Sequence, residues 1–161
     1  MVFIDGMNFL RAWKSTCNER KLDRRTRWDA LKLRNMLTIL ELDRTLVQIR
    51  YYSSTIAAKD ARYLGYLKSV DPRGFHQFLE RKGYRCVIGK NRVRHEECPL
   101  CNHEYPRVKE KGIDVAIALD MVIAGIEGKF DVAILVSGDA DFIPATRLRS
   151  LRMRFLNISR L

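Results

Sequence analysis

Asp131-Val-Ala-Ile-Leu-Val-Ser-Gly-Asp-Ala-Asp-Phe-Ile-Pro144 is the stretch that decides the fold. Its apolar run, residues 132–136, is typical of a buried parallel strand. The run ends at Ser137, and two acidic residues follow closely, Asp139 and Asp141. Open α/β sheets bind ligands at the carboxyl ends of their strands, so this stretch predicts a functional edge that carries two carboxylates.

Strands and helices are expected to alternate along the rest of the chain. Further strands are predicted at residues 2–5, 46–52, 84–88 and 153–158. Helices are predicted at residues 28–42, 57–69, 73–82, 113–126 and 142–151, and another could begin at Phe9. This alternation predicts one α/β domain over residues 1–161, with a mainly parallel sheet of about five strands and helices on both faces. The helix at 113–126 is apolar on most sides and is expected to be buried.

The net charge of the chain indicates which class of partner to expect. Its 161 residues include 30 Lys and Arg against 19 Asp and Glu, a formal net charge of +11. This excess favours a polyanion, most simply nucleic acid, and a basic protein without such a partner is the alternative. No apolar run reaches the roughly 20 residues of a membrane span, and Met1 leads straight into an expected strand. We therefore expect a cytoplasmic protein.

A basic stretch, residues 14–27, is expected to be a solvated loop or helix end that meets phosphates. The side chains expected to bind nucleic acid are Arg11, Lys14, Arg24, Arg25, Lys109 and Lys111. A solvated surface without a ligand is the alternative. Phe9, Trp13 and Tyr105 could stack on bases near the edge, although each is more commonly a packing residue.

Two more acids fall at the ends of expected elements. Asp5 ends the first strand, and Asp114 begins the apolar helix. If one cleft collects them with Asp139 and Asp141, their carboxylates repel one another, and a divalent cation removes that cost. Oxygen ligands favour Mg²⁺ or Mn²⁺, which promote phosphodiester hydrolysis by activating water and neutralising charge on phosphate. Taken singly, each acid is more simply a turn or cap residue.

Three segments carry a family likeness: Phe3–Phe9, Lys109–Asp120 and Ala133–Pro144. In order and spacing they resemble the three motifs of the NYN domain family, most closely its LabA-like branch, within the PIN-like nuclease superfamily. The resemblance implies a PIN-like three-layer α/β/α sandwich. It also implies an endoribonuclease that depends on Mg²⁺ or Mn²⁺.

Carried over residue by residue, the resemblance also implies a site. The metal-binding acids would be Asp5, Asp114, Asp139 and Asp141. Asn8 would orient a ligand or the metal-bound water, and Ser137 would shape the turn and hydrogen-bond an acid. Asp120 matches a family position too, but it lies six residues after Asp114 and therefore on a different helical face. We expect it to support the site from behind.

Residues 89–111 look like an insertion between a strand and the apolar helix. They contain four residues that could bind zinc: His95, Cys98, Cys101 and His103. Cys-x-x-Cys is a common half of a structural zinc site, and the segment resembles a knuckle found in part of the NYN family. Such a zinc ion would hold a basic loop beside the active edge. A reduced loop without metal and a redox pair or disulfide are the alternatives.

The function expected from these features is hydrolysis of phosphodiester bonds in single-stranded RNA, whose bases and backbone are accessible to a cleft. A non-catalytic RNA-binding or regulatory module on the same fold is one alternative, and a DNA-directed nuclease is another. The set of acids argues against a pure binder, because anionic groups that face phosphate weaken binding. The sequence leaves open whether the chain forms a homodimer.

Overall fold

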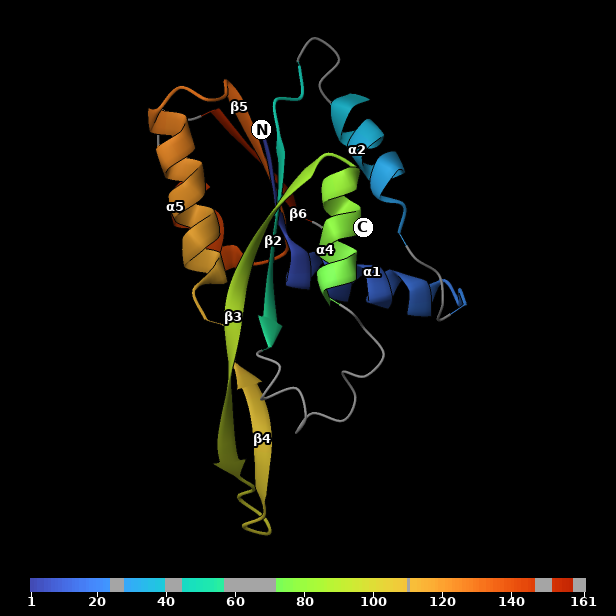
Figure 1. Cartoon of the computed structure of the whole chain (residues 1–161), viewed down its shortest axis with the longest axis vertical. Coiled ribbons are helices and arrows are strands. Elements are labelled where there is room, and N and C mark those ends of the chain that lie inside the picture. Colours follow the sequence, from blue (N-terminus) through green and yellow to red (C-terminus); the bar gives the residue numbers. More distant parts are fainter. Residues whose placement is uncertain (24–27, 40–44, 57–71, 110, 147–151, 158–161) are drawn as a thin grey trace.

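The computed structural model describes residues 1–23, 28–39, 45–56, 72–109, 111–146 and 152–157 (Figure 1). These residues form a sheet with the strand order β4-β3-β2-β1-β5-β6. The strands are β1 (Val2–Asp5), β2 (Ile49–Ile56), β3 (Tyr84–Glu97), β4 (Glu104–Lys109), β5 (Val132–Ser137) and β6 (Arg152–Asn157). Parallel pairing joins β3, β2, β1, β5 and β6, whereas β4 runs antiparallel to β3. The predicted parallel α/β sheet is therefore confirmed.

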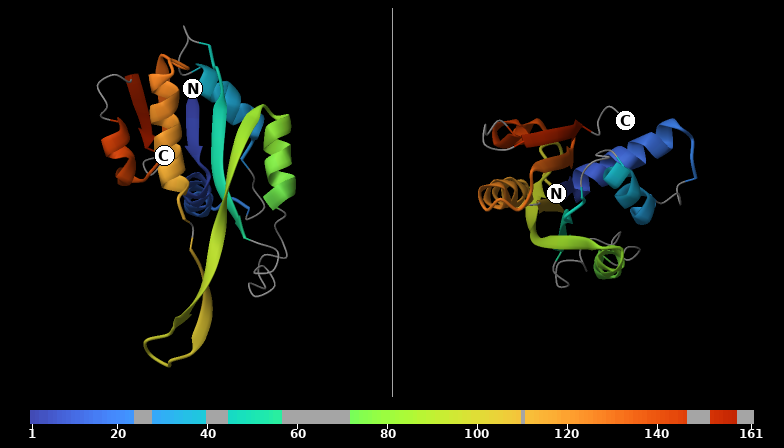
Figure 2. Two further views of the ribbon diagram at one scale, coloured as in Figure 1. Left: turned by 60° about the vertical axis from the view of Figure 1, so that its left-hand side comes forward. Right: turned by 90° about the horizontal axis from the view of Figure 1, so that it is seen from above.

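Helices cover both faces of this sheet (Figure 2). They are α1 (Gly6–Glu19), α2 (Ala30–Ile39), α4 (Pro72–Arg81), α5 (Ile113–Ile126) and α6 (Ile143–Thr146), with a 3₁₀ turn, η2, at Ala140–Phe142. Helices α1, α2 and α4 lie on one face and α5 and α6 on the other (Figures 1 and 2). None of the helices in the described part of the chain is long and apolar enough to cross a membrane.

The alternation of side chains along β1 divides the core into two layers. Val2 and Ile4 belong to a cluster that includes residues of α2 and α4, whereas Phe3 belongs to a cluster with Ile117 and Met121 of α5. Successive residues of a strand point to opposite faces, so a strand between two helical layers must be apolar throughout. This explains the continuous apolar runs of β1 and β5, and it gives the α/β/α sandwich that the sequence predicts.

Helix α1 begins earlier than the sequence suggests. Gly6 and Asn8, which precede the possible helix start at Phe9, form its first turn. The helix continues through Lys14 to Glu19, where a solvated loop or helix end was expected. The reason is Asp5, whose side chain accepts a hydrogen bond from the backbone N–H of Asn8 and so caps the helix. The helix predicted at 57–69 lies outside the described residues.

The expected insertion is a β-hairpin rather than a loop. Strand β3 pairs with β2 as far as Asn91 and then continues, paired with β4, to Glu97. The hairpin projects beyond the body of the domain (Figure 1). Its charged, alternating sequence lacks the apolar run used to recognise the other strands, because this ribbon has no helical layer to cover it.

The prediction that α5 is buried on most sides is wrong. Ile113, Ile117, Met121 and Ala124 are buried against the sheet. The opposite side of the helix is exposed, and its apolar residues there are Val115, Leu119, Ile123 and Ile126. Apolar content alone therefore overstated how much of this helix the described domain covers.

Candidate active site at the carboxyl edge of the sheet

Strands β1 and β5 are neighbours, and both end at the same edge of the sheet. Ile4 pairs with Val136, so the residues that follow them, Asp5 and Ser137, lie side by side. The Ser137 hydroxyl donates a hydrogen bond to Asp5 Oδ2 at 3.1 Å, and the Asn8 backbone N–H donates to Asp5 Oδ1 at 3.0 Å. Asp5 is only 5% exposed. The two bonds fix both oxygens of a buried carboxyl group.

A short relay of hydrogen bonds continues from this carboxyl into the turn after β5. The Asp139 backbone N–H donates to Ser137 Oγ at 3.1 Å, and the Asp141 N–H donates to Asp139 Oδ1 at 2.9 Å. Asn8 joins the two loops, because its side-chain oxygen accepts from the Gly138 N–H at 2.8 Å. The turn that carries Asp139 is thereby tied to the first turn of α1.

Burial raises the pKa of Asp5 above its ordinary value of 3.8. The hydrogen bonds from Asn8 and Ser137 lower that pKa, the neighbouring Asp139 carboxylate raises it, and the Arg11 guanidinium lowers it. The net direction is upward because burial outweighs the opposing contributions. Asp5 and Asp139 are therefore close enough to repel each other, as the sequence predicts for acids at adjacent strand ends.

Gly6 makes this arrangement possible. The need for glycine at this position was not predicted from the sequence. A Cβ atom at residue 6 would lie 2.5 Å from Cζ of Tyr51 and 2.5 Å from the backbone oxygen of Tyr52. The tight approach lets α1 start directly against β2. The tripeptide Asp5-Gly6-Met7 thus encodes a helix cap followed by close packing, and not a flexible loop.

The structure does not gather the four predicted acids into one group. Asp114 is exposed in the first turn of α5, and Asp141 is exposed in η2. Among the described residues, no three His, Cys, Asp or Glu side chains are close enough together to hold a metal ion. What the structure brings together is Asp5 and Asp139, with Ser137 between them. The roles of Asp114 and Asp141 stay predictions.

Asp120 has a different environment from these acids. Its Oδ2 atom lies 2.9 Å from Nη1 of Arg50 and accepts a hydrogen bond from the Tyr52 hydroxyl at 2.7 Å. Arg50 is also held by Gln48, at 2.8 Å, and lies over the ring of Phe3. These contacts tie α5 to β2, and support of the acidic site by Asp120 stays a prediction. Arg50, a charged residue between Ile49 and Tyr51 in β2, was the sequence signal for such a partner.

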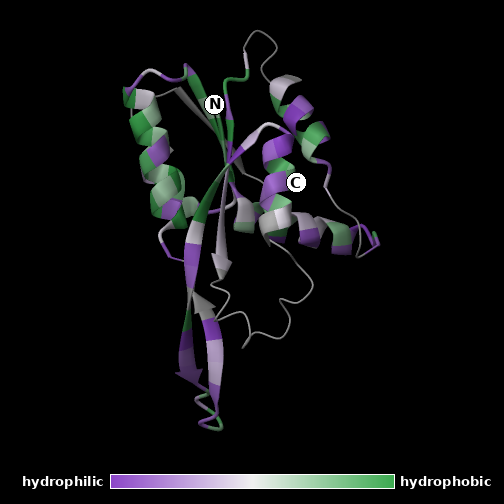
Figure 3. Cartoon of the chain, viewed as in Figure 1, coloured by the Kyte–Doolittle hydropathy of each residue, from purple (hydrophilic) through white to green (hydrophobic). Residues whose placement is uncertain are grey.

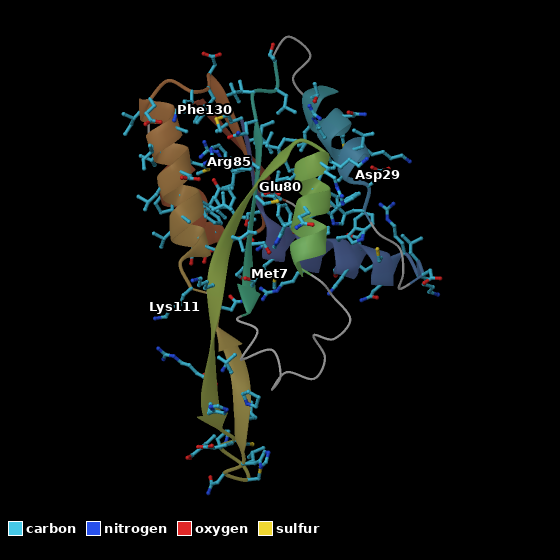
Figure 4. The ribbon with its side chains drawn as sticks, viewed as in Figure 1. Met7, Asp29, Glu80, Arg85, Lys111 and Phe130 are labelled. Atoms are coloured by element: carbon cyan, nitrogen blue, oxygen red, sulfur yellow. The ribbon has the colours of Figure 1, made fainter. Side chains whose placement is uncertain are left out.

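The residues predicted to bind nucleic acid are only partly described. Arg11 and Lys14 are exposed on α1, and Lys111 is exposed between β4 and α5. Figure 4 shows Lys111 near the root of the hairpin, toward the end of the body where Met7 of α1 also lies. Arg24 and Arg25 lie outside the described residues, and the side chain of Lys109 is not described.

The aromatic residues proposed to stack on bases have different surroundings. Phe9 packs edge-to-face on Trp28, with ring centroids 5.1 Å apart, so it belongs to the core. Trp13 is half-buried, and Tyr105 is exposed on β4. Tyr105 therefore remains the more accessible of these three rings for a ligand.

A cavity of about 340 Å³ lies at the other end of the strands. Its lining includes Met1, Leu37 and Val132, and β1 and β5 begin there. Because Asp5 and Asp139 lie at the opposite ends of the same two strands, this cavity is not part of the acidic site.

At the tip of the hairpin, Cys98 and Cys101 are free thiols. The backbone N–H groups of Leu100 and Cys101 bond to the Cys98 sulfur, and these bonds together with the Cys101 side chain lower the pKa of Cys98. His95 and His103 do not join them, since no group of three metal-binding side chains occurs in the described residues. In the described residues the four predicted ligands do not lie together, and zinc binding by them stays a prediction.

Together, the parallel sheet and the acids at its carboxyl edge define an α/β protein of the PIN-like class. The chain belongs to the NYN domain family, whose model matches residues 1–158. This family lies within the PIN-like nuclease superfamily, so the chain is a nuclease-family protein whose substrate class is nucleic acid. No curated protein and no solved structure matches it. Its assignment to the LabA-like branch stays a prediction.

Proposed function

We propose that this protein is a metal-dependent endoribonuclease that hydrolyses phosphodiester bonds in single-stranded RNA. The observation that carries the proposal is the pair Asp5 and Asp139 at the carboxyl edge of the sheet. Asp5 is buried, its pKa is raised, and the contacts described for it include no salt bridge to a basic side chain. Because burial disfavours the ionised form, a charged carboxyl group at this position costs the fold stability, which favours a functional role for it.

The two carboxylates fit a Mg²⁺ or Mn²⁺ ion. Mg²⁺ is usually held by one or two carboxylates together with waters and substrate phosphates, so two acids suffice without a cage of four. When bound, the ion would neutralise charge on the phosphate and lower the pKa of a water molecule. Asp5 and Asp139 would hold it directly. Asp114 and Asp141 are proposed to assist on the strength of the family motifs alone.

The surrounding side chains would keep these oxygens in place. Because Ser137 Oγ already accepts a hydrogen bond from the Asp139 N–H, its own proton is available to Asp5, which sets the direction of that bond. Asn8 locks the adjacent turn through Gly138, and its amide NH₂ group is proposed to orient a ligand. Rigid support of this kind reduces the reorganisation needed during a reaction.

The basic surface would bring the substrate to this edge. Arg11 lies close enough to affect the pKa of Asp5, and Lys14 follows on the same helix. The net charge of +11 predicts RNA affinity that falls steeply with salt concentration, because bound Lys and Arg displace counterions. A DNA-directed nuclease and a non-catalytic RNA-binding module remain the competing functions.

The test compares the wild type, Asp139→Asn and Asp131→Asn on labelled single-stranded RNA and DNA. Asp131 is a matched control, since it is an exposed aspartate immediately before β5. We expect cutting of RNA with Mg²⁺ or Mn²⁺ and none with EDTA. Asp139→Asn should lose about a hundredfold or more of the rate, because a metal contributes several kcal/mol to stabilising the transition state, and Asp131→Asn should retain the rate.

Cutting that persists in EDTA or in Asp139→Asn would refute the mechanism. Binding of RNA without cutting under each metal would instead support the non-catalytic module. Preference for the DNA strand under the same conditions would favour the DNA-directed nuclease.

A further inference from the structure

The tip of the hairpin is chemically unlike the rest of the chain. Residues 95–106 contain no Lys or Arg, although the whole chain has 30 of them. Basic residues such as Arg94, Arg107 and Lys111 lie before and after this segment. The hairpin is mostly hydrophilic (Figure 3), so burial of apolar side chains does not explain why it projects from the body. A tip without positive charge is poorly suited to hold RNA.

The tip is instead built around two thiols. The Asn102 N–H donates to the Cys98 carbonyl oxygen at 2.8 Å, and the Cys98 N–H donates to the His103 carbonyl oxygen at 2.9 Å. Asn102 has a φ of 53°, a left-handed conformation that turns the chain sharply after Cys101. The tight turn holds the Cys101 side chain within hydrogen-bonding reach of the Cys98 sulfur. Paired sulfurs on such a turn are half of a tetrahedral zinc site.

In this structure the histidines of the same chain are not arranged to supply the other half. Along a strand, side chains alternate between faces, so His95 lies on the face of the hairpin opposite to Cys98. His103 lies across the hairpin from Cys98, whose backbone N–H donates to the His103 carbonyl oxygen, and the His103 side chain is exposed. Within the described residues it does not form a group of three with the two thiols. A structural zinc ion takes four protein ligands, and one tip therefore lacks two of them.

We propose that the hairpin tips of two copies of this chain share one zinc ion, with Cys98 and Cys101 of each copy as its four ligands. The zinc site is incomplete in one chain, and a second copy supplies the missing pair of thiolates. This inference does not depend on the proposed nuclease activity, which uses a separate site.

The length of the hairpin lets two copies meet at their tips while their bodies stay apart. The ribbon that extends beyond β2 is six residue pairs long, from Arg92 paired with Lys109 to Glu97 paired with Glu104. At about 3.3 Å a residue it reaches roughly 20 Å. The screening length at physiological ionic strength is about 8 Å, so two bodies joined tip to tip repel each other weakly despite their charge of +11 each.

The local contacts at the tip are compatible with a close approach. Glu96, which shares the face of Cys98, is neutralised by Arg107 at 2.7 Å. Glu97 and Glu104 pair on the other face of the ribbon and therefore point away from the thiols. Leu100, between the two cysteines, is 95% exposed and could pack against the second tip.

The test measures zinc content and molecular mass on the same sample, in the presence of a non-thiol reductant. We expect half an equivalent of zinc for each chain, together with a dimer by light scattering. A zinc chelator, or the double variant Cys98→Ser/Cys101→Ser, should give a monomer without zinc. X-ray absorption should show four sulfur neighbours at about 2.3 Å and no nitrogen shell near 2.0–2.1 Å.

His95→Ala and His103→Ala are the matched controls, and both should keep the zinc and the dimer. One zinc ion for each monomer, or loss of zinc in either histidine variant, would overturn the proposal in favour of a site within one chain. Absence of zinc, or a dimer that persists in the double serine variant, would also overturn it. Nuclease activity for each chain should be the same in the double variant, which separates this test from that of the acidic site.

Discussion

Replacing Asp120 with alanine tests whether this acid of the second family motif supports the fold or belongs to the metal site. In the structure, Asp120 accepts a hydrogen bond from Tyr52 at 2.7 Å and pairs with Arg50 at 2.9 Å. The tyrosine is fully buried, and the arginine side chain is 9% exposed. Both would lose an acceptor in Asp120→Ala, and water reaches this position only in part because the Asp120 side chain is 36% exposed.

The cost can be worked out from these contacts. A buried hydroxyl left without an acceptor costs about 1–3 kcal/mol. Breaking a buried ion pair costs about 3–5 kcal/mol. Asp120 is 36% exposed and Arg50 keeps its hydrogen bond to Gln48, so we expect the loss of this ion pair to cost about 3 kcal/mol or less. We therefore expect a loss on the order of 3 kcal/mol, or about 6–12 °C in melting temperature for a chain of this size.

A double-mutant cycle with Tyr52→Phe sharpens this prediction. In the wild-type background, removing the hydroxyl should cost about 1 kcal/mol, since the bond to Asp120 is lost. In the Asp120→Ala background, the same change should be neutral or stabilising, because it removes a buried donor that has lost its partner. Chemical denaturation of the four proteins measures the coupling, and equal costs in both backgrounds would refute the network.

Activity separates this role from that of the metal-binding acids. Asp120→Ala should retain its rate for each folded molecule at a temperature well below its melting point. Asp139→Asn should show the reverse, with little change in melting temperature and a large loss of rate. If Asp120→Ala instead lost activity as completely as Asp139→Asn while remaining folded, the supporting role would be wrong.

Three further changes test the architecture of the site. Gly6→Ala should destabilise the fold by about 2 kcal/mol, because its Cβ would meet Tyr51 and the Tyr52 backbone at 2.5 Å; an unchanged denaturation midpoint would contradict this close packing. Ser137→Ala removes a hydrogen bond that lowers the pKa of Asp5, so the acidic limb of the pH–rate profile should move to higher pH, and an unmoved limb would count against that bond. The pKa of Asp5 is raised in the folded state, so its favourable contribution to stability is complete below pH 3.8 and is lost as the pH rises through the folded value. Without metal, Asp5→Asn should remove this loss of stability in thermal melts. An identical pH dependence in the variant would exclude Asp5 as the source of the loss.

The sheet could be predicted because each buried strand is marked by its own short stretch of sequence. The apolar runs at residues 2–4 and 132–136 each mark a strand buried on both faces, and the helical segments between strands require parallel connections. Acids that end two such strands must lie near each other if the strands are neighbours. Asp5 and Asp139 follow this rule, so the central part of the candidate site could be predicted from the sequence.

The features that escaped prediction depend on contacts between distant residues. Asp120 and Arg50 are 70 positions apart, and their pairing depends on which face of α5 meets β2. The need for glycine at residue 6 arises only once Tyr51 is in place. The hairpin was missed for another reason: its ribbon is exposed on both sides, so its sequence carries no apolar period. Asp114 marks a helix start, and that position alone does not fix where its carboxylate points.

The electrostatics of the acidic edge argue that a cation must precede the substrate. Asp5 caps α1, and the positive end of that helix contributes only about 0.3–1 kcal/mol to an anion placed there. A phosphate charge about 4 Å from one carboxylate would be repelled by about 4 kcal/mol near a protein surface, and Asp139 adds a second carboxylate. Neither the helix end nor the exposed Arg11 offsets this repulsion. A divalent ion on Asp5 and Asp139 would turn this repulsion into attraction. RNA should therefore occupy this edge in the presence of Mg²⁺ or Mn²⁺. Without the ion, RNA should be held only by Lys and Arg side chains away from the edge.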